Sequence, residues 1–102
     1  MVTKNKKIQI KFLGSLRHDL DRPLLLWPIE TNISIRSIVT ALTQDSQYQE
    51  LRSFFSETID VKRSLLIFLN DQEISVLSGM ETLVSEDDTL TLIPVVHGGT
   101  SP

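Results

Sequence analysis

The sequence contains no cysteine among its 102 residues. This absence excludes disulfides, thiolate zinc sites, iron–sulfur clusters and a cysteine nucleophile. No apolar run approaches the roughly 20 residues that a membrane-spanning helix needs, and residues 1–12 lack the apolar stretch of a secretion signal. We therefore expect a cytoplasmic protein that works without a membrane.

Basic residues are scarce in the second half of the chain. Residues 1–50 carry seven Lys or Arg against five Asp or Glu, whereas residues 51–102 carry three against eight. A nucleic-acid site would show a basic stripe interleaved with aromatics, and the only basic cluster is Lys4, Lys6, Lys7 and Lys11. We interpret that cluster as a solvated approach to a strand. We expect no direct contact with nucleic acid and a basic partner surface for the acidic half.

Catalytic signatures are also missing. The sequence has no glycine-rich phosphate loop, no zinc-protease helix and no nucleophile elbow. Its two histidines, His18 and His97, are far apart and neither has a carboxylate at metal-ligand spacing. The sequence therefore predicts no catalytic residues, no metal site and no bound cofactor, and we expect a protein that other enzymes act on.

A chain of this length supports one hydrophobic core and is too short for two. Period-2 alternation and short apolar runs predict strands over residues 8–12, 24–27, 64–69, 73–77 and 89–93. The second of these belongs at a sheet edge, because Pro23 and Pro28 cannot donate to a ladder. The run 64–69 is nearly all apolar, which is typical of a strand buried on both faces, and Asn70-Asp71 supplies the turn that ends it.

Helical spacing occurs in two places. One apolar stripe falls at i, i+3, i+4 and i+7 and consists of Ile35, Ile38, Val39 and Leu42. Ser34 stands at its N-cap. Ser46 with Gln49 forms a weaker capping box and predicts a short helix over residues 46–55.

The order of these elements predicts an α+β fold. Two hairpin-like ends joined by a helical crossover imply a mixed sheet, with one main helix packed on one face and the first and last strands parallel at its centre. This is the β-grasp, or ubiquitin-like, architecture. A ferredoxin-like split βαβ fold would need a second long helix before the last strand, and residues 78–88 are too polar and turn-rich to form one. We expect one domain over residues 1–97 and a flexible tail over residues 98–102.

The tail contains Gly98-Gly99. Glycine near a chain end is typical of a floppy terminus. It also lets an extended chain enter a narrow active site, because the backbone has no Cβ atoms and adopts φ/ψ values denied to other residues. By itself the pair does not separate these two interpretations.

Three segments of the second half resemble a known group of proteins. They are Leu66-Ile67-Phe68-Leu69-Asn70-Asp71, Glu86-Asp87-Asp88-Thr89-Leu90 and Ile93-Pro94-Val95-Val96-His97-Gly98-Gly99. Their order and spacing resemble the C-terminal half of ubiquitin-like sulfur carriers. Pro94-Val95 is similar to the small subunit of molybdopterin synthase, and His97-Gly98-Gly99 is similar to the ubiquitin-related modifier family. Small archaeal modifier proteins resemble both.

The resemblance implies a donor cycle. An E1-like enzyme would adenylate the carboxylate of Gly99 with its own ATP, and the product would become a thiocarboxylate for a sulfur acceptor or an isopeptide bond to a target lysine. By the same resemblance, Gly98 gives Gly99 access, and His97 and Pro94 shape the exit from the last strand. A molybdopterin synthase small subunit and a β-grasp interaction module that does not conjugate remain the alternatives.

One departure matters for that cycle. Thr100-Ser101-Pro102 follow Gly99 and lock its carboxyl in an amide. We therefore expect cleavage between Gly99 and Thr100, by a JAMM-type metalloprotease or a cysteine protease. For the partner surface we expect outward residues of the last strand and its neighbour, namely Leu66, Phe68, Ile93 and Val95.

Overall fold

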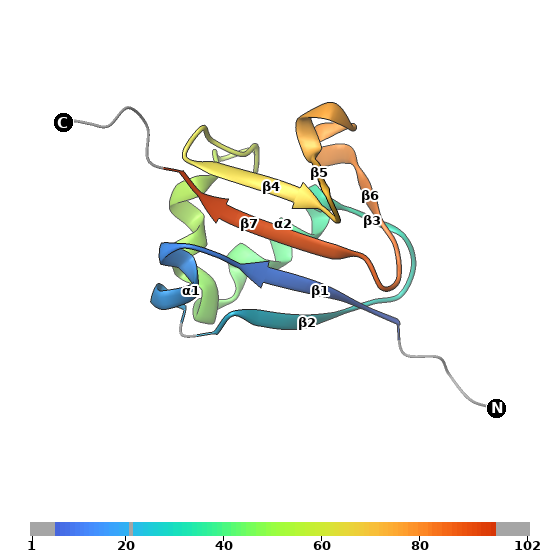
Figure 1. The fold of residues 1–102 in the computed structure, drawn as a ribbon, viewed down its shortest axis with the longest axis horizontal. Coiled ribbons are helices and arrows are strands. Elements are labelled where there is room, and N and C mark those ends of the chain that lie inside the picture. The colour runs from blue at the N-terminus through green and yellow to red at the C-terminus, as the bar shows by residue number, and fades with distance from the viewer. Residues whose placement is uncertain (1–5, 21, 96–102) are drawn as a thin grey trace.

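A computed structural model describes residues 6–20 and 22–95 (Figure 1). Its main element is a five-stranded mixed sheet in the order β2-β1-β7-β4-β5. The strands are β1 (Lys6–Phe12), β2 (Leu24–Ile29), β4 (Leu65–Leu69), β5 (Gln72–Glu73) and β7 (Thr89–Pro94). Over the described ranges, no helix combines the length and apolarity that crossing a membrane requires.

The centre of the sheet has the predicted topology. β1 and β7 pair in parallel, with Ile10 opposite Leu90, and β2 and β4 pair antiparallel to them on either side. β2 is an edge strand, as Pro23 and Pro28 predict. The prediction of a β-grasp fold is confirmed.

The main helix, α2 (Ile35–Gln44), covers one face of the sheet (Figure 1). The Ser34 hydroxyl caps it by accepting a hydrogen bond from the Ser37 N–H at 3.1 Å. Its apolar stripe is fully buried, as the spacing predicts, and consists of Ile35, Ile38, Val39 and Leu42. Burial of side chains of this size stabilises the fold by roughly 1.5–3 kcal/mol each.

The strands supply the other half of the core through alternate residues. Ile8, Ile10 and Phe12 are completely buried on β1, while Gln9 and Lys11 between them are exposed. The Phe12 ring stacks on Tyr48, with 6.3 Å between the centroids. All the described hydrophobic burial therefore lies between the sheet and the elements on the α2 side, and the opposite face is open.

The strand predicted over residues 64–69 is β4, and the prediction that it is buried on both faces is wrong. Leu65, Ile67 and Leu69 are buried, but Leu66 is 38% exposed and Phe68 is half-buried. The residues alternate because only α2 and its neighbours cover the sheet, on one side. An apolar run shows that both faces are hydrophobic, but it does not show that both are covered.

Two element boundaries also differ from the predictions. Residues 46–54 form two short 3₁₀ helices with a kink at Tyr48. Their cap is Asp45 instead of Ser46, since the Asp45 carboxylate accepts from the Gln47 N–H at 2.9 Å. The strand predicted over 73–77 ends at Glu73, because that carboxylate caps the Ser75 N–H and starts a 3₁₀ turn (Ile74–Val76).

Several short elements were not predicted. They are α1 (Ser15–Asp19) and a two-stranded sheet of β3 (Ile33–Ser34) and β6 (Leu83–Val84); a 3₁₀ turn (Gly79–Glu81) lies before β6, where Gly79 predicts a turn. α1 buries only Leu16, so it has no apolar periodicity. β3 and β6 are too short for alternation to be visible in the sequence.

The long connection between α2 and β4 is held by Arg36. Its guanidinium contacts the Glu81 carboxylate at 2.8 Å, the Asp60 carboxylate at 2.9 Å and the Ile59 carbonyl at 3.0 Å. A hydrogen bond from Thr58, and after it the contact with Arg36, lowers the pKa of Asp60. Ile59, whose carbonyl accepts from Arg36, has φ 58°, a conformation that β-branched residues rarely adopt.

Candidate functional site

The residues predicted to carry the chemistry lie at the end of the chain. His97, Gly98, Gly99 and Thr100 are outside the described residues, as is the predicted domain boundary at residue 97. The structure does describe the strand that leads to them, up to Val95. Within the described residues, the candidate site is therefore the exit of β7.

Pro94 ends the pairing of β7 with β1. The Leu92 carbonyl accepts the Leu13 N–H at 3.0 Å, so even-numbered residues of β7 turn their backbone groups toward β1. Pro94 is also even-numbered, so its backbone nitrogen faces β1, but it has no N–H to donate. On the other side, the Val95 N–H still donates to the Ser64 carbonyl at 2.9 Å. Beyond Leu92, the described chain is thus hydrogen-bonded on the β4 side.

The end of β1 turns away beside this exit. Gly14 has φ 60° and ψ −140°, which is essentially glycine territory. A Cβ built on Gly14 would lie 3.6 Å from the Pro94 Cδ, an ordinary contact distance. The requirement for glycine here comes from the backbone conformation, and the turn that it permits leaves Pro94 as the last residue of β7.

The four residues predicted as a partner surface lie together at this exit. Leu66 pairs with Ile93, and both point away from α2 because their neighbours Leu65 and Ile67 are buried. Phe68 lies two residues after Leu66, and Val95 two residues after Ile93, so each shares the face of the earlier residue. We call these four residues, Leu66, Phe68, Ile93 and Val95, the exit patch. The structure brings them to one face, while their role in binding stays a prediction.

Acidic residues border the exit patch on the β5 side. Glu73 pairs with Phe68 across the β4–β5 hairpin, and Asp71 is exposed in its turn. The adjoining Asp87-Asp88 pair forms the turn into β7, as predicted, with the Asp88 carboxylate accepting from the Ser85 N–H at 2.8 Å. Within residues 6–20 and 22–95, no three His, Asp or Glu side chains gather in a group that could hold a metal ion.

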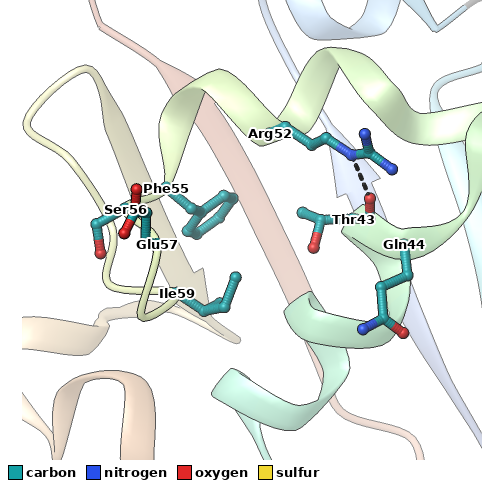
Figure 2. Close-up of a pocket in the computed structure, with 7 residues that line it drawn as sticks. All are labelled: Thr43, Gln44, Arg52, Phe55, Ser56, Glu57 and Ile59. Atoms are coloured by element: carbon teal, nitrogen blue, oxygen red, sulfur yellow. Dashed lines mark hydrogen bonds between the residues drawn. The ribbon is translucent and has the colours of Figure 1, made fainter.

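A pocket of about 250 Å³ lies elsewhere, between the end of α2 and residues 52–59. Figure 2 shows Phe55 and Ile59 on one side of it and Thr43 on the other. The Arg52 Nε donates to the Thr43 carbonyl at 2.7 Å (Figure 2). The remaining lining residues are Gln44, Ser56 and Glu57. This set pairs no nucleophile with a base, and it contains no residue of the exit patch. No sequence motif marks this pocket, because its walls combine the end of α2, the 3₁₀ segment and the loop after it.

The comparisons with known proteins agree with this geometry. A family model described as Urm1 (Ubiquitin related modifier) matches residues 7–99. The chain belongs to the Urm1 family. The resemblance found in the sequence is therefore confirmed.

Individual relatives of the chain span almost its whole length. Small archaeal modifier protein 3 of Haloferax volcanii is 22% identical over 93 residues, covering 91% of this chain and 99% of its own. A ubiquitin-related modifier 1 homolog of Chlamydomonas reinhardtii is 25% identical, with 91% and 98% covered. The solution structure of small archaeal modifier protein 1 from Methanosarcina acetivorans superposes with a TM-score of 0.75 at 26% identity, covering 95% of this chain and 100% of that one.

The family match ends at Gly99. The matched region includes Gly98 and Gly99 and stops before Thr100. Family membership therefore extends through the predicted carrier residues, whereas the three residues after them are outside it.

Proposed function

We propose that this member of the Urm1 family is a ubiquitin-like modifier and sulfur carrier that an E1-like enzyme activates at the carboxylate of Gly99. The observation that carries the proposal is that the family match continues beyond the central strand β7, which ends at Pro94, runs through Gly98-Gly99 and stops there. Residues 100–102 are removed first. The chain itself catalyses no step and binds no cofactor.

The proposed cycle has three chemical steps. Hydrolysis of the Gly99–Thr100 amide releases Thr100-Ser101-Pro102 and leaves a carboxylate. A carboxylate oxygen attacks the α-phosphorus of ATP bound to the activating enzyme, pyrophosphate leaves, and Gly99 becomes an acyl adenylate. A nucleophile then displaces AMP from the carbonyl carbon.

Two nucleophiles lead to two fates. A persulfide forms an acyl disulfide, which a second thiol reduces to a thiocarboxylate while itself becoming part of a disulfide. The amine of a target lysine instead forms an isopeptide bond and loses a proton. A molybdopterin synthase small subunit would follow the first route only.

Three features support this use of the exit. Gly98 and Gly99 carry no Cβ, so the backbone can approach catalytic groups closely. Pro94 ends pairing with β1 and leaves Val95 bonded to Ser64. The exit patch offers apolar side chains beside the point where the tail leaves, and we propose it as the docking surface of the activating enzyme.

The test is ATP–pyrophosphate exchange with the E1-like enzyme of the source cells. We expect the chain ending at Gly99 to support exchange and the chain ending at Pro102 to give background only. Gly99→Ala in the shorter chain should reduce exchange by about 100-fold or more, because the reacting carbon is displaced. Leu83→Ala, an exposed position outside the exit patch, is the control. Exchange at background level with the chain ending at Gly99 contradicts the proposal.

The trimming step has its own test. The full chain is incubated in extract from the source cells, and the loss of residues 100–102 is followed by intact mass. A metal chelator should block the loss if the protease is of the JAMM type, and a thiol alkylator should block it if the protease is a cysteine enzyme. Persistence of the full chain in active extract argues against processing.

Thr100-Ser101-Pro102 favour a second candidate, a β-grasp interaction module that does not conjugate. Such a module binds its partner through the sheet and has no use for a free Gly99 carboxylate. Gly99→Ala separates the two candidates, since a carrier loses activation and a module keeps its partner.

A further inference from the structure

The edge strand β2 exposes apolar side chains and an unpaired backbone. Leu24 is 43% exposed and Leu26 is 54% exposed. β2 pairs with β1 on one side, and within the described residues no strand pairs with its other side. It lies along the lower edge of the sheet in Figure 1, with β4 and β5 at the opposite edge.

The register shows which backbone groups are free. The Phe12 N–H donates to the Pro23 carbonyl at 3.1 Å, so odd-numbered residues of β2 turn their backbone groups toward β1. Leu24 and Leu26 therefore direct their N–H and C=O groups away from the sheet. For these two N–H groups the described part of the chain contains no acceptor.

Two prolines limit this free edge. The backbone of Pro28 faces the same outer side of β2 as the backbones of Leu24 and Leu26. Because proline has no N–H, the outer side lacks a hydrogen-bond donor at this position. Pro23 begins the strand at the other end. Outward donors are therefore confined to Leu24 and Leu26, which protects the edge from long, unspecific strand pairing. A short added strand would still find two donors and their carbonyls in one fixed register.

Apolar side chains are available on both faces of that short stretch. Leu24 and Leu26 point to the open face, and Leu25 and Trp27 are half-buried against the core. A strand added at this edge would contact Leu24 and Leu26 on one side and Leu25 and Trp27 on the other. Backbone bonds and side-chain pockets together are the physical basis of β-strand addition.

The charges around the edge select the occupant. Lys11 is opposite Leu24 and Lys7 is opposite Pro28, both on the open face. Neither lysine has an ion-pair partner among the described residues. Arg22, at the start of β2, lies over the Tyr48 ring at 5.9 Å. Glu30 is an exposed acidic residue just beyond the strand's end.

These cations disfavour a second copy of the chain as the occupant. Two β2 strands paired antiparallel would place four lysines, Lys7 and Lys11 of each copy, on one sheet face, each one strand in from the seam. This accumulation of like charge disfavours the pairing. An acidic strand meets the same lysines favourably. Cationic side chains flanking an apolar centre thus fit a segment with carboxylates at its ends and aliphatic residues between them.

We propose that the free edge of β2 binds an extended segment of a partner protein, aliphatic at its centre and acidic at its flanks, as an added strand of the sheet. This site goes beyond the proposed function. It uses neither Gly99 nor the exit patch, so a partner held here leaves the carrier chemistry of the tail free. Binding at β2 and activation at Gly99 can therefore fail or succeed separately.

The test uses the full chain, labelled with ¹⁵N, and a capped seven-residue peptide with a valine–isoleucine–valine centre and two aspartates at each end. We expect the largest amide shifts at Leu24 and Leu26. Leu26→Glu should raise the Kd at least tenfold, because it places a carboxylate among those of the peptide. Val76→Glu is the matched control, since Val76 is 71% exposed in a turn away from β2, and its Kd should change less than twofold.

A second pair of variants tests the charge argument. Lys11→Glu should raise the Kd at least threefold, and Lys62→Glu, an exposed lysine in the connection before β4, should not. A peptide with lysine flanks should bind at least tenfold more weakly than the aspartate peptide. Unchanged amide shifts elsewhere in each variant show that the fold is intact, and Gly99→Ala should bind the peptide as the natural chain does.

Other outcomes overturn the proposal. Shifts centred on the exit patch or on the pocket of Phe55 and Ile59 place the peptide elsewhere. Equal affinity for lysine-flanked peptides removes the charge argument. Concentration-dependent shifts at Leu24 and Leu26 without peptide, together with a dimer in sedimentation, assign the edge to a second copy.

Discussion

The open face of the sheet carries two apolar surfaces, which differ in what they offer a partner. The exit patch lies on β4 and β7, which pair with each other along the patch, so it presents the side chains of a sheet face. The edge strand β2 also offers free backbone groups at Leu24 and Leu26. Acidic residues border the first surface and lysines border the second. Polar side chains separate them, namely Gln9, Thr89 and Thr91.

This difference indicates how one small domain can meet two kinds of partner. A paired sheet face suits a broad protein surface with its own apolar residues, as we propose for the activating enzyme. An unpaired edge suits an extended chain. Each surface should therefore be separable from the other, and both should be separable from the core on the α2 side.

The largest expected effect separates the core from both surfaces. Phe12→Ala should lower the free energy of unfolding by about 3–5 kcal/mol, because it leaves a cavity against Tyr48. Leu26→Ala should lower it by less than about 0.5 kcal/mol, since Leu26 is already exposed. Denaturant unfolding of the two variants measures both values. Similar losses would mean that β2 is covered in the free protein.

A second substitution separates the two surfaces. Phe68→Glu should raise the KM of the activating enzyme for the chain ending at Gly99 by about 30-fold, the scale of a central interface residue at about 2 kcal/mol. Leu24→Glu should change that KM less than about twofold. Pyrophosphate exchange at several protein concentrations gives both numbers. If Leu24→Glu is the more harmful of the two, the activating enzyme docks on β2.

A smaller effect concerns the acidic border of the exit patch. Glu73→Lys should raise the same KM about threefold to fivefold, because Glu73 lies opposite Phe68 and we expect a basic partner surface there. Glu57→Lys, an exposed carboxylate on the rim of the separate pocket, is the control. Equal effects of the two substitutions would indicate that only net charge matters.

The smallest expected effect is on pH dependence and concerns the contact of Arg36 with Asp60. The pKa of Asp60 is lower in the folded chain than its ordinary value of 3.8, chiefly through Thr58 and then Arg36. Asp60 therefore contributes stability that is present above pH 3.8 and is lost as pH falls through the lowered value. Asp60→Asn should flatten the acid limb of an unfolding-against-pH curve. An equally steep limb in Asp60→Asn would contradict this role.

The sequence predicted the fold because local patterns and long-range topology agree. The alternation of Ile8, Ile10 and Phe12 and the stripe from Ile35 to Leu42 specify which faces meet. Pro23 and Pro28 predict the edge position of β2. The burial of β4 could not be predicted, since Leu66 and Phe68 are as apolar as the buried residues beside them.

The site was predictable only in part. Gly98-Gly99 is a local signal, and the positions of Leu66 and Ile93 follow from strand parity. The pocket beside Ile59 joins the end of α2 to residues 52–59, and Arg36 reaches the same loop from α2 through the Ile59 carbonyl. Local sequence patterns show neither contact. The free backbone of β2 depends on the register that the Phe12–Pro23 hydrogen bond establishes, which becomes visible only in the structure.

The most direct test of the central claim is the intact mass of the protein isolated from its own cells, with fragmentation of the C-terminal peptide. Our account predicts a chain that ends at Gly99, with a fraction in which one carboxyl oxygen is replaced by sulfur or in which Gly99 is joined to a lysine. A population that consists entirely of chains ending at Pro102, in cells that contain the activating enzyme, would contradict it.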